Sequence, residues 1–157
     1  MLRPQLVAGL VAFVALATMS ACSRQEPKQA SGSHVEAPGH PSTWFTAAEI
    51  GARLGVAVGE GRATGPLGTS SAWRGQDGVS VEIQIVRDVS FWSSPTSAKG
   101  YAPLEAIGKA AYLVDTENGA KASSLLEGGF VTVLVAGVPD TRAAAQRLLV
   151  DTLPRVR

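Results

Sequence analysis

Residues 110–135 read AAYLVDTENGAKASSLLEGGFVTVLV, and this is the most informative stretch of the chain. Three segments in it have strand character, and they cover residues 110–116, 120–126 and 130–135. Asn118-Gly119 is typical of a type I′ hairpin turn, and Glu127-Gly128-Gly129 marks a second turn. The stretch therefore predicts three consecutive antiparallel strands. The nearly continuous apolar run of the third one indicates a central strand that is covered on both faces.

Upstream of this meander, two further strands are expected. Apolar and polar residues alternate over 79–85, which is the period of a strand with one face on a core. Residues 70–74 form a shorter strand candidate, in which Trp73 is expected to be a core residue. The glycine-rich span 59–68 is interpreted as a loop.

Helices are expected at both ends of the folded region. Thr46 and Glu49 form a T-x-x-E capping box, and Gly55 is a natural helix end. Asp140 caps a last helix that Pro154 ends, and a short helix starting near Ser94 is also expected. The pattern predicts an α+β domain over residues 44–157, with an antiparallel sheet of about five to six strands packed by an N-terminal and a C-terminal helix.

The first 43 residues have a different character. Arg3 precedes an uninterrupted apolar or small run over residues 6–17, which is the layout of a signal peptide covering residues 1–21. Residues 22–43 contain prolines, glycines and serines with Val35 as the only sizeable apolar side chain, so they predict a disordered linker after Cys22. His34 and His40 lie in this segment without a third ligand nearby, so no metal site is expected.

Residues 19–22, Met-Ser-Ala-Cys, resemble the lipobox of bacterial lipoproteins. The resemblance implies that the Cys22 thiol receives diacylglycerol, that cleavage precedes Cys22, and that the new amine also receives an acyl chain such as palmitate. Several acyl chains are needed for stable anchoring, because each buried methylene contributes about 0.8 kcal/mol. The alternative is an ordinary secreted protein in which Cys22 is incidental. Cys22 is the only cysteine of the chain, which favours lipidation over a disulfide.

The charge balance limits the partners of the mature chain. Without Arg3, 13 basic residues remain against 13 acidic ones. There is therefore no electrostatic case for nucleic acid and no polybasic segment for anionic lipid. The expected membrane link is the lipid on Cys22 alone, at the outer membrane of a diderm or the outer face of the plasma membrane of a monoderm.

Motifs for catalysis are missing from the predicted domain. The expected domain has no histidine and no cysteine, so neither a Ser-His-Asp triad nor thiol catalysis is available, and no cofactor motif is complete. Four carboxylates lie near predicted turns, namely Glu105, Asp115, Glu117 and Glu127. A pair of them acting as acid and base remains an alternative to simple solvated charges.

Aromatic residues form the candidate binding surface. Phe91 and Trp92 are adjacent, and Tyr101 follows a short polar segment. Aromatic side chains are enriched at interfaces, so these three are candidates for a pocket rim or a partner-binding patch. The alternative places one of them in the core and another over its edge.

The order of elements also resembles a known group. The pieces are Leu54-Gly55 at a helix end, Trp73 in a strand, the alternating strand 79–85, residues 107–112 (IGKAAY), the strand 130–135 and a final Ala/Leu helix. Over residues 46–153 the chain resembles small bacterial envelope lipoproteins with a PsbP-like α/β sandwich. That resemblance implies sensing, binding or assembly in the envelope and no enzyme activity.

Three functions are therefore open. The preferred one is a non-enzymatic lipoprotein whose domain binds an envelope protein or a small ligand. The others are an envelope hydrolase with paired carboxylates and a structural subunit of an envelope complex.

Overall fold

The computed structural model describes residues 39–65 and 69–156. The predicted signal peptide, Cys22, His34 and most of the predicted linker lie outside the described residues. The helices are α1 (Pro41–Trp44), α2 (Ala47–Leu54) and α3 (Thr141–Thr152), with short 3₁₀ turns η2 (Val89–Phe91) and η3 (Leu153–Arg155). The strands are β1 (Arg62–Thr64), β2 (Ser70–Arg74), β3 (Ser80–Val86), β4 (Ala102–Pro103), β5 (Ala110–Thr116), β6 (Gly119–Leu125) and β7 (Phe130–Ala136).

The strands form one antiparallel sheet in the order β1-β2-β3-β7-β6-β5-β4. The α+β class is confirmed, with seven strands in the described residues where five to six were predicted. The strands absent from the prediction are β1, which lies in the glycine-rich span, and β4. They have three and two residues and lie at the two edges, so neither is long enough to show a periodic pattern.

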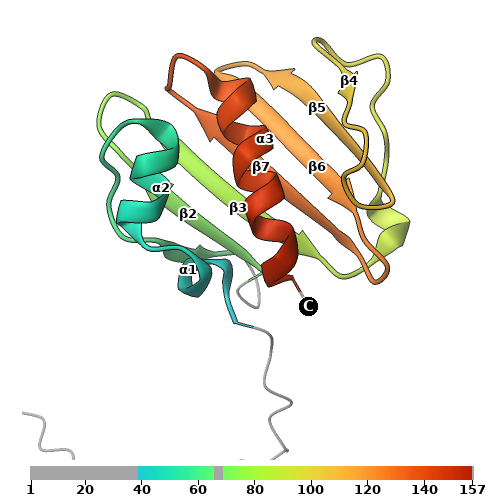
Figure 1. Cartoon of the computed structure of the whole chain (residues 1–157), viewed down its shortest axis with the longest axis horizontal. Coiled ribbons are helices and arrows are strands. Elements are labelled where there is room, and N and C mark those ends of the chain that lie inside the picture. The colour runs from blue at the N-terminus through green and yellow to red at the C-terminus, as the bar shows by residue number, and fades with distance from the viewer. Residues whose placement is uncertain (1–38, 66–68, 157) are drawn as a thin grey trace, which may run out of the picture. The chain divides into compact units, whose positions relative to one another are not determined.

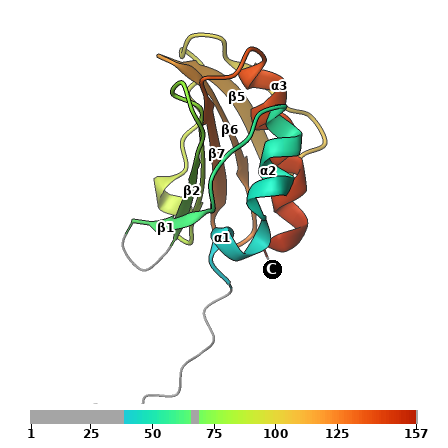
Figure 2. The same cartoon turned by 90° about the vertical axis from the view of Figure 1, so that its left-hand side faces the viewer.

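Both long helices cover the same face of the sheet (Figures 1 and 2). The α2 capping box is present as predicted, and Gly55 ends the helix in the left-handed conformation with a φ of 73°. Ile50 of α2 and Leu148 of α3 are both fully buried. They belong to one core cluster with the inward residues of β3 and β7, namely Val81, Ile83, Ile85, Val131, Val133 and Val135.

The opposite face of the sheet is called the open face below, because neither α2 nor α3 covers it (Figure 2). Side chains alternate between faces along a strand, so Glu82 and Gln84 of β3 lie on it. Through the register, Gln84 pairs with Thr132 of β7, and Thr132 pairs with Ser123 of β6. The turn η2 lies on this side of the sheet (Figure 2).

Three local predictions were wrong. The linker was predicted to reach residue 43, but helix α1 starts at Pro41, which is buried, and the Ser42 amide donates to Ser71 Oγ at 2.8 Å. Turns replace the short helix expected from Ser94, and η2 forms upstream instead because the Asp88 carboxylate caps it at the Ser90 amide. The β5–β6 hairpin exists, but neither central residue, Glu117 nor Asn118, has a positive φ, so its turn is not type I′.

Candidate functional site

An aromatic cluster occupies one end of the open face. The Trp92 ring lies 5.3 Å from that of Tyr112 and 5.6 Å from that of Phe130. Tyr101 stacks on Tyr112 at 6.2 Å with an interplanar angle of 30°. The ammonium of Lys121 lies 5.6 Å from the centre of the Tyr112 ring on the same face, which is cation–π geometry. The term aromatic cluster denotes Trp92, Tyr101, Tyr112 and Phe130 from here on.

The segment between β3 and β4 is tied down at several points. Ser94 Oγ and the Tyr101 hydroxyl are 3.2 Å apart, within hydrogen-bond distance. The Asp115 amide donates to the Lys99 carbonyl at 2.9 Å. Arg142 of α3 donates to the Gly100 carbonyl at 2.8 Å and forms an ion pair with Asp115 at 2.5 Å. These contacts give the segment a defined position over the sheet.

The three aromatic residues predicted from sequence have different environments. Trp92 is half-buried, and Tyr101 is joined to it through Tyr112. Phe91 is apart from this cluster, with 71% of its surface exposed, and Val89 on the same turn is 50% exposed. One aromatic residue therefore covers the sheet while its neighbour stays exposed to solvent. Trp73 is in the core, 0% exposed, as predicted, and meets Phe45 edge to face at 6.4 Å.

Tyr112 and Phe130 were missed as members of the cluster. Both lie within predicted strands, and only the strand register shows that they share a face: Tyr112 pairs with Ser123, and Phe130 pairs with Leu125, two residues further along β6. The alternation of side chains along each strand was available from the sequence, but the relative offset of the strands was not.

Two of the four candidate carboxylates, Asp115 and Glu127, lie at opposite ends of the β5–β6 hairpin. Asp115 pairs with Ala120 near one end of the β5–β6 hairpin, whereas Glu127 follows Leu125 at the other end. Five residues of strand separate these positions, about 17 Å at the usual rise, against about 5–9.5 Å for a glycosidase pair. Asp115 is held by Arg142, and Glu127 lies 3.6 Å from Lys109. The geometry of these two carboxylates thus favours the solvated or structural interpretation.

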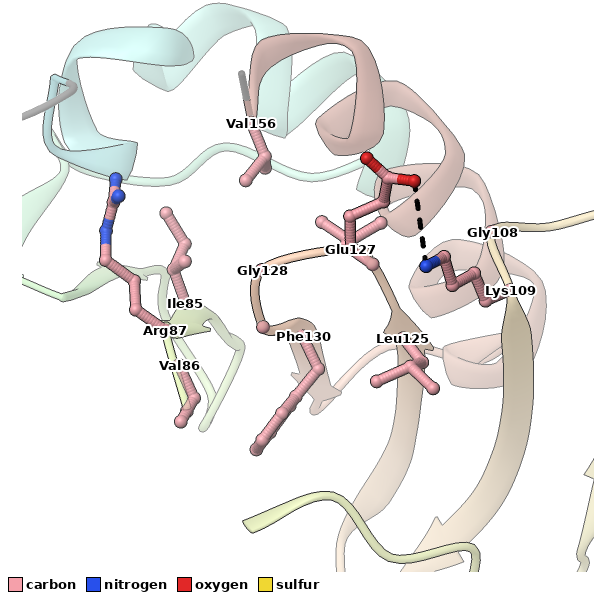
Figure 3. A pocket seen from close by; sticks show the side chains of 12 residues that line it. Ile85, Val86, Arg87, Gly108, Lys109, Leu125, Glu127, Gly128, Phe130 and Val156 are labelled. Atoms are coloured by element: carbon pink, nitrogen blue, oxygen red, sulfur yellow. Dashed lines mark ion pairs between the residues drawn. The ribbon is translucent and has the colours of Figure 1, made fainter. Parts of the chain in front are cut away.

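A cavity of about 520 Å³ lies where β3 ends and β7 begins (Figure 3). Its apolar wall is formed by Ile85, Val86, Leu125, Leu126, Phe130 and Val156. Arg87 stands on one side, and Lys109 and Glu127 stand on the other, with Gly128 and Phe130 between them (Figure 3). The helix α1 is at the same end of the sheet, since Ser71, its hydrogen-bond partner, pairs with Ile83, two residues before Ile85 of the cavity wall.

Within the described ranges, no group of three or more histidine, cysteine, aspartate or glutamate side chains is arranged to hold a metal ion. Nor does any helix there have the length and apolar character needed to cross a membrane. Comparison of the chain with protein-family models, curated proteins and solved structures gave no match.

Proposed function

We propose that this chain is a bacterial lipoprotein whose folded domain has a non-enzymatic binding or accessory role in the cell envelope. Acyl chains on Cys22 would anchor it, and the domain would meet its partner protein through the open face beside Phe91. The lipobox-like residues 19–22 and the leader-like residues before them support the anchor. The PsbP-like resemblance is part of the same proposal, supported by the order of a capped helix, antiparallel strands and a final helix.

The observation that carries the binding role is the exposure of Phe91 on a held turn. The Phe91 amide donates to the Asp88 carbonyl at 3.4 Å, and the Trp92 amide donates to the Val89 carbonyl at 3.0 Å. Large aromatic side chains that are presented by a positioned backbone are common binding anchors, since little conformational entropy is lost on contact. Val89 adds apolar surface on the same turn.

Photo-crosslinking in intact membranes tests the binding face. A photoreactive phenylalanine at position 91 should give a discrete cross-linked product. Position 150 is the matched control, because Val150 is 46% exposed but lies on α3. In a separate affinity purification from the same membranes, Phe91→Ala should abolish recovery of the partner identified by cross-linking. Its unfolding midpoint should stay unchanged. Identical products from positions 91 and 150, or no product from 91, would remove Phe91 from the proposal.

The anchor has its own test. Mass spectrometry of the mature N-terminal peptide should show a diacylglyceryl group on Cys22, and Cys22→Ala should leave the chain unprocessed or free in solution. A bare thiol on a membrane-free mature chain would rule out the anchor.

A further inference from the structure

We propose that the cavity beside Arg87 and Lys109 binds an anionic amphiphile, a molecule with an apolar body and one carboxylate or phosphate group. This proposal extends the binding role proposed above. It rests on that role in one respect, because the proposed lipid anchor would keep the domain near a membrane that supplies such molecules. The cavity itself does not depend on the chemistry of Cys22, so the amphiphile site and the lipid anchor can be disproved separately.

The size and walls of the cavity suit an apolar body. Its volume of about 520 Å³ lies within the range of about 300–1,000 Å³ that is usual for small-molecule sites. Six apolar residues from β3, β6, the turn after β6, β7 and the C-terminal segment line it. Gly128 lies in the wall, and a Cβ atom placed there would meet no heavy atom within 4 Å, so the wall is open at this point.

The charges around the cavity select an anion. Arg87 is exposed and makes no ion pair with any described residue, so its guanidinium is available. Among the described residues, the Lys109 ammonium has Glu127 as its one ion-pair partner, at 3.6 Å, and the two side chains are 56% and 93% exposed. Such exposed pairs contribute little, about 0–1 kcal/mol. An anionic group on a bound ligand can therefore pair with Arg87, while Lys109 adds positive charge on the opposite side of the cavity (Figure 3).

The position of the cavity fits a ligand drawn from a membrane. Helix α1, the first described element, lies at this end of the sheet through the Ser42–Ser71 hydrogen bond. The chain that leads to Cys22 therefore joins the domain at the end that contains the cavity. An anchored domain would be tethered from this end.

The test uses the full-length gene product after processing by the cell that expresses it. The protein is placed in phosphatidylcholine nanodiscs or, if it is soluble, in buffer. The probe is dansyl-labelled undecanoic acid, followed by its fluorescence increase on titration. Saturable binding is expected, and the matching neutral dansyl undecanol should bind about tenfold more weakly because it forms no charge-assisted hydrogen bond. Equal binding of acid and alcohol would overturn the assignment of an anion.

Two variants at glycines locate the site. Gly128→Leu should narrow the open edge of the cavity and weaken binding of the probe by about tenfold, the order expected when apolar contacts of a ligand are lost. Gly59→Leu is the matched control, because its Cβ would meet only the Arg74 carbonyl at 3.5 Å, away from this cavity. Unchanged affinity in a folded Gly128→Leu chain would overturn the proposal, and unfolding midpoints establish that both variants are folded.

Charge variants provide a second, independent measurement. Arg87→Ala should weaken binding several-fold, and Glu127→Gln should strengthen it because it removes the only acidic side chain of the wall. Arg62→Ala is the control, since Arg62 is exposed on β1 and does not line this cavity. If Arg87→Ala and Arg62→Ala have the same effect, Arg87 does not hold the anion.

Competition distinguishes the two sources of the ligand. If decanoate in solution displaces the probe and phosphatidylglycerol in the nanodisc does not, the site takes free amphiphiles. If phosphatidylglycerol nanodiscs lower the affinity for the probe, the site takes lipids from the bilayer. If neither competes in the wild-type chain, the cavity is not an amphiphile site. This result would hold whether or not mass spectrometry shows a lipid on Cys22.

Discussion

The ring of Trp92 lies 5.3 Å from the ring of Tyr112, inclined at 47°. This contact fastens the segment after β3 to the open face of the sheet. It also means that Trp92 has a structural role, in contrast to Phe91 next to it. The two neighbours therefore need different experiments.

Trp92→Ala should lower the free energy of unfolding by about 2–3 kcal/mol. The estimate is below the usual cost of truncating a fully buried tryptophan because Trp92 is half-buried. Phe91→Ala should change it by less than about 0.5 kcal/mol, since its side chain is 71% exposed. Urea denaturation measures both. Equal losses in the two variants would contradict the division between a covering and an exposed aromatic residue.

Two adjacent serines of β6 should respond in opposite ways. Ser123 Oγ lies 3.0 Å from Thr132 Oγ1 in a buried hydrogen bond, whereas the buried Ser124 Oγ has no hydrogen-bond partner among the described residues. Ser123→Ala should therefore cost about 1 kcal/mol, and Ser124→Ala should be neutral or stabilising by about 0.5 kcal/mol. Thermal unfolding midpoints provide the comparison. A clear loss on Ser124→Ala would show that this hydroxyl has a partner after all.

Arg142→Ala should loosen the segment before β4. It removes the ion pair with Asp115 and the hydrogen bond to the Gly100 carbonyl, and the paired side chains are only 38% and 30% exposed. The expected loss of stability is about 1 kcal/mol because solvent screens the pair. Hydrogen exchange at the Asp115 amide should become faster than in the wild type. Arg147→Ala is the control on the same helix, since in the described part of the chain the Arg147 side chain donates only to the Ala143 carbonyl. An equal effect there would contradict the prediction.

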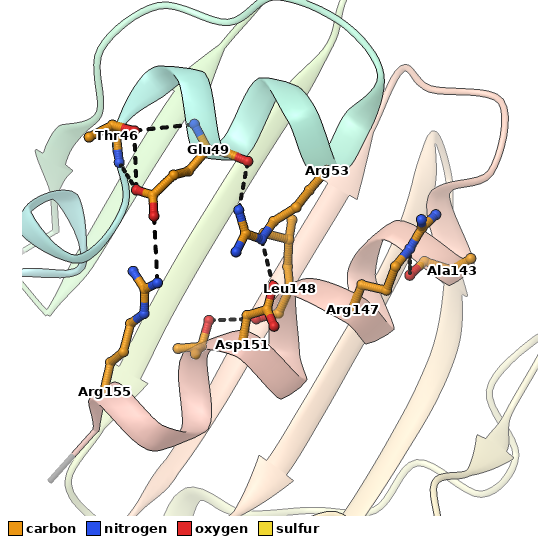
Figure 4. A network of polar contacts seen from close by, with 9 residues as sticks. Thr46, Glu49, Arg53, Ala143, Arg147, Leu148, Asp151 and Arg155 are labelled. Carbon is orange, nitrogen blue, oxygen red and sulfur yellow. Dashed lines mark hydrogen bonds and ion pairs between the residues drawn. The ribbon is translucent and has the colours of Figure 1, made fainter.

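The capping box of α2 should make stability depend on pH. Glu49 accepts a hydrogen bond from the Thr46 amide at 2.8 Å and lies 3.7 Å from Arg155 (Figure 4). The backbone hydrogen bond from Thr46, followed by that of its side chain, lowers the pKa of Glu49. A lowered pKa in the folded state means that the charged form stabilises folding above the unfolded pKa. That contribution is lost as the pH falls below the ordinary pKa of a glutamate and through the lower folded pKa.

Glu49→Gln isolates this contribution, because glutamine can still complete the capping box but does not titrate. The wild type should have the higher unfolding midpoint at pH 6, and the difference should shrink steadily as the pH falls below the ordinary pKa of a glutamate. A constant difference across that range would show that the charge of Glu49 does not stabilise the fold.

Local signals predicted the main elements well. The Thr46–Glu49 capping box, the αL Gly55 and the Asp140 cap mark helix ends, and each acts through hydrogen bonds or backbone conformation within a few residues. Strand β5 was predicted with its observed bounds, as was β2. The edge strands β1 and β4 were missed, because with three and two residues they are too short to show alternation, and only their hydrogen bonds to the next strand mark them.

By itself, the sequence determined an α+β domain, its capped helices, its central strands and the buried position of Trp73. All of these follow from apolar periodicity or from hydrogen bonds between near neighbours. Only the tertiary structure decided which aromatic residues meet, which carboxylates lie apart, and that Arg87 and Lys109 flank one cavity. These relationships depend on strand order and register, which arise from the simultaneous burial of many side chains and leave no mark on any single segment.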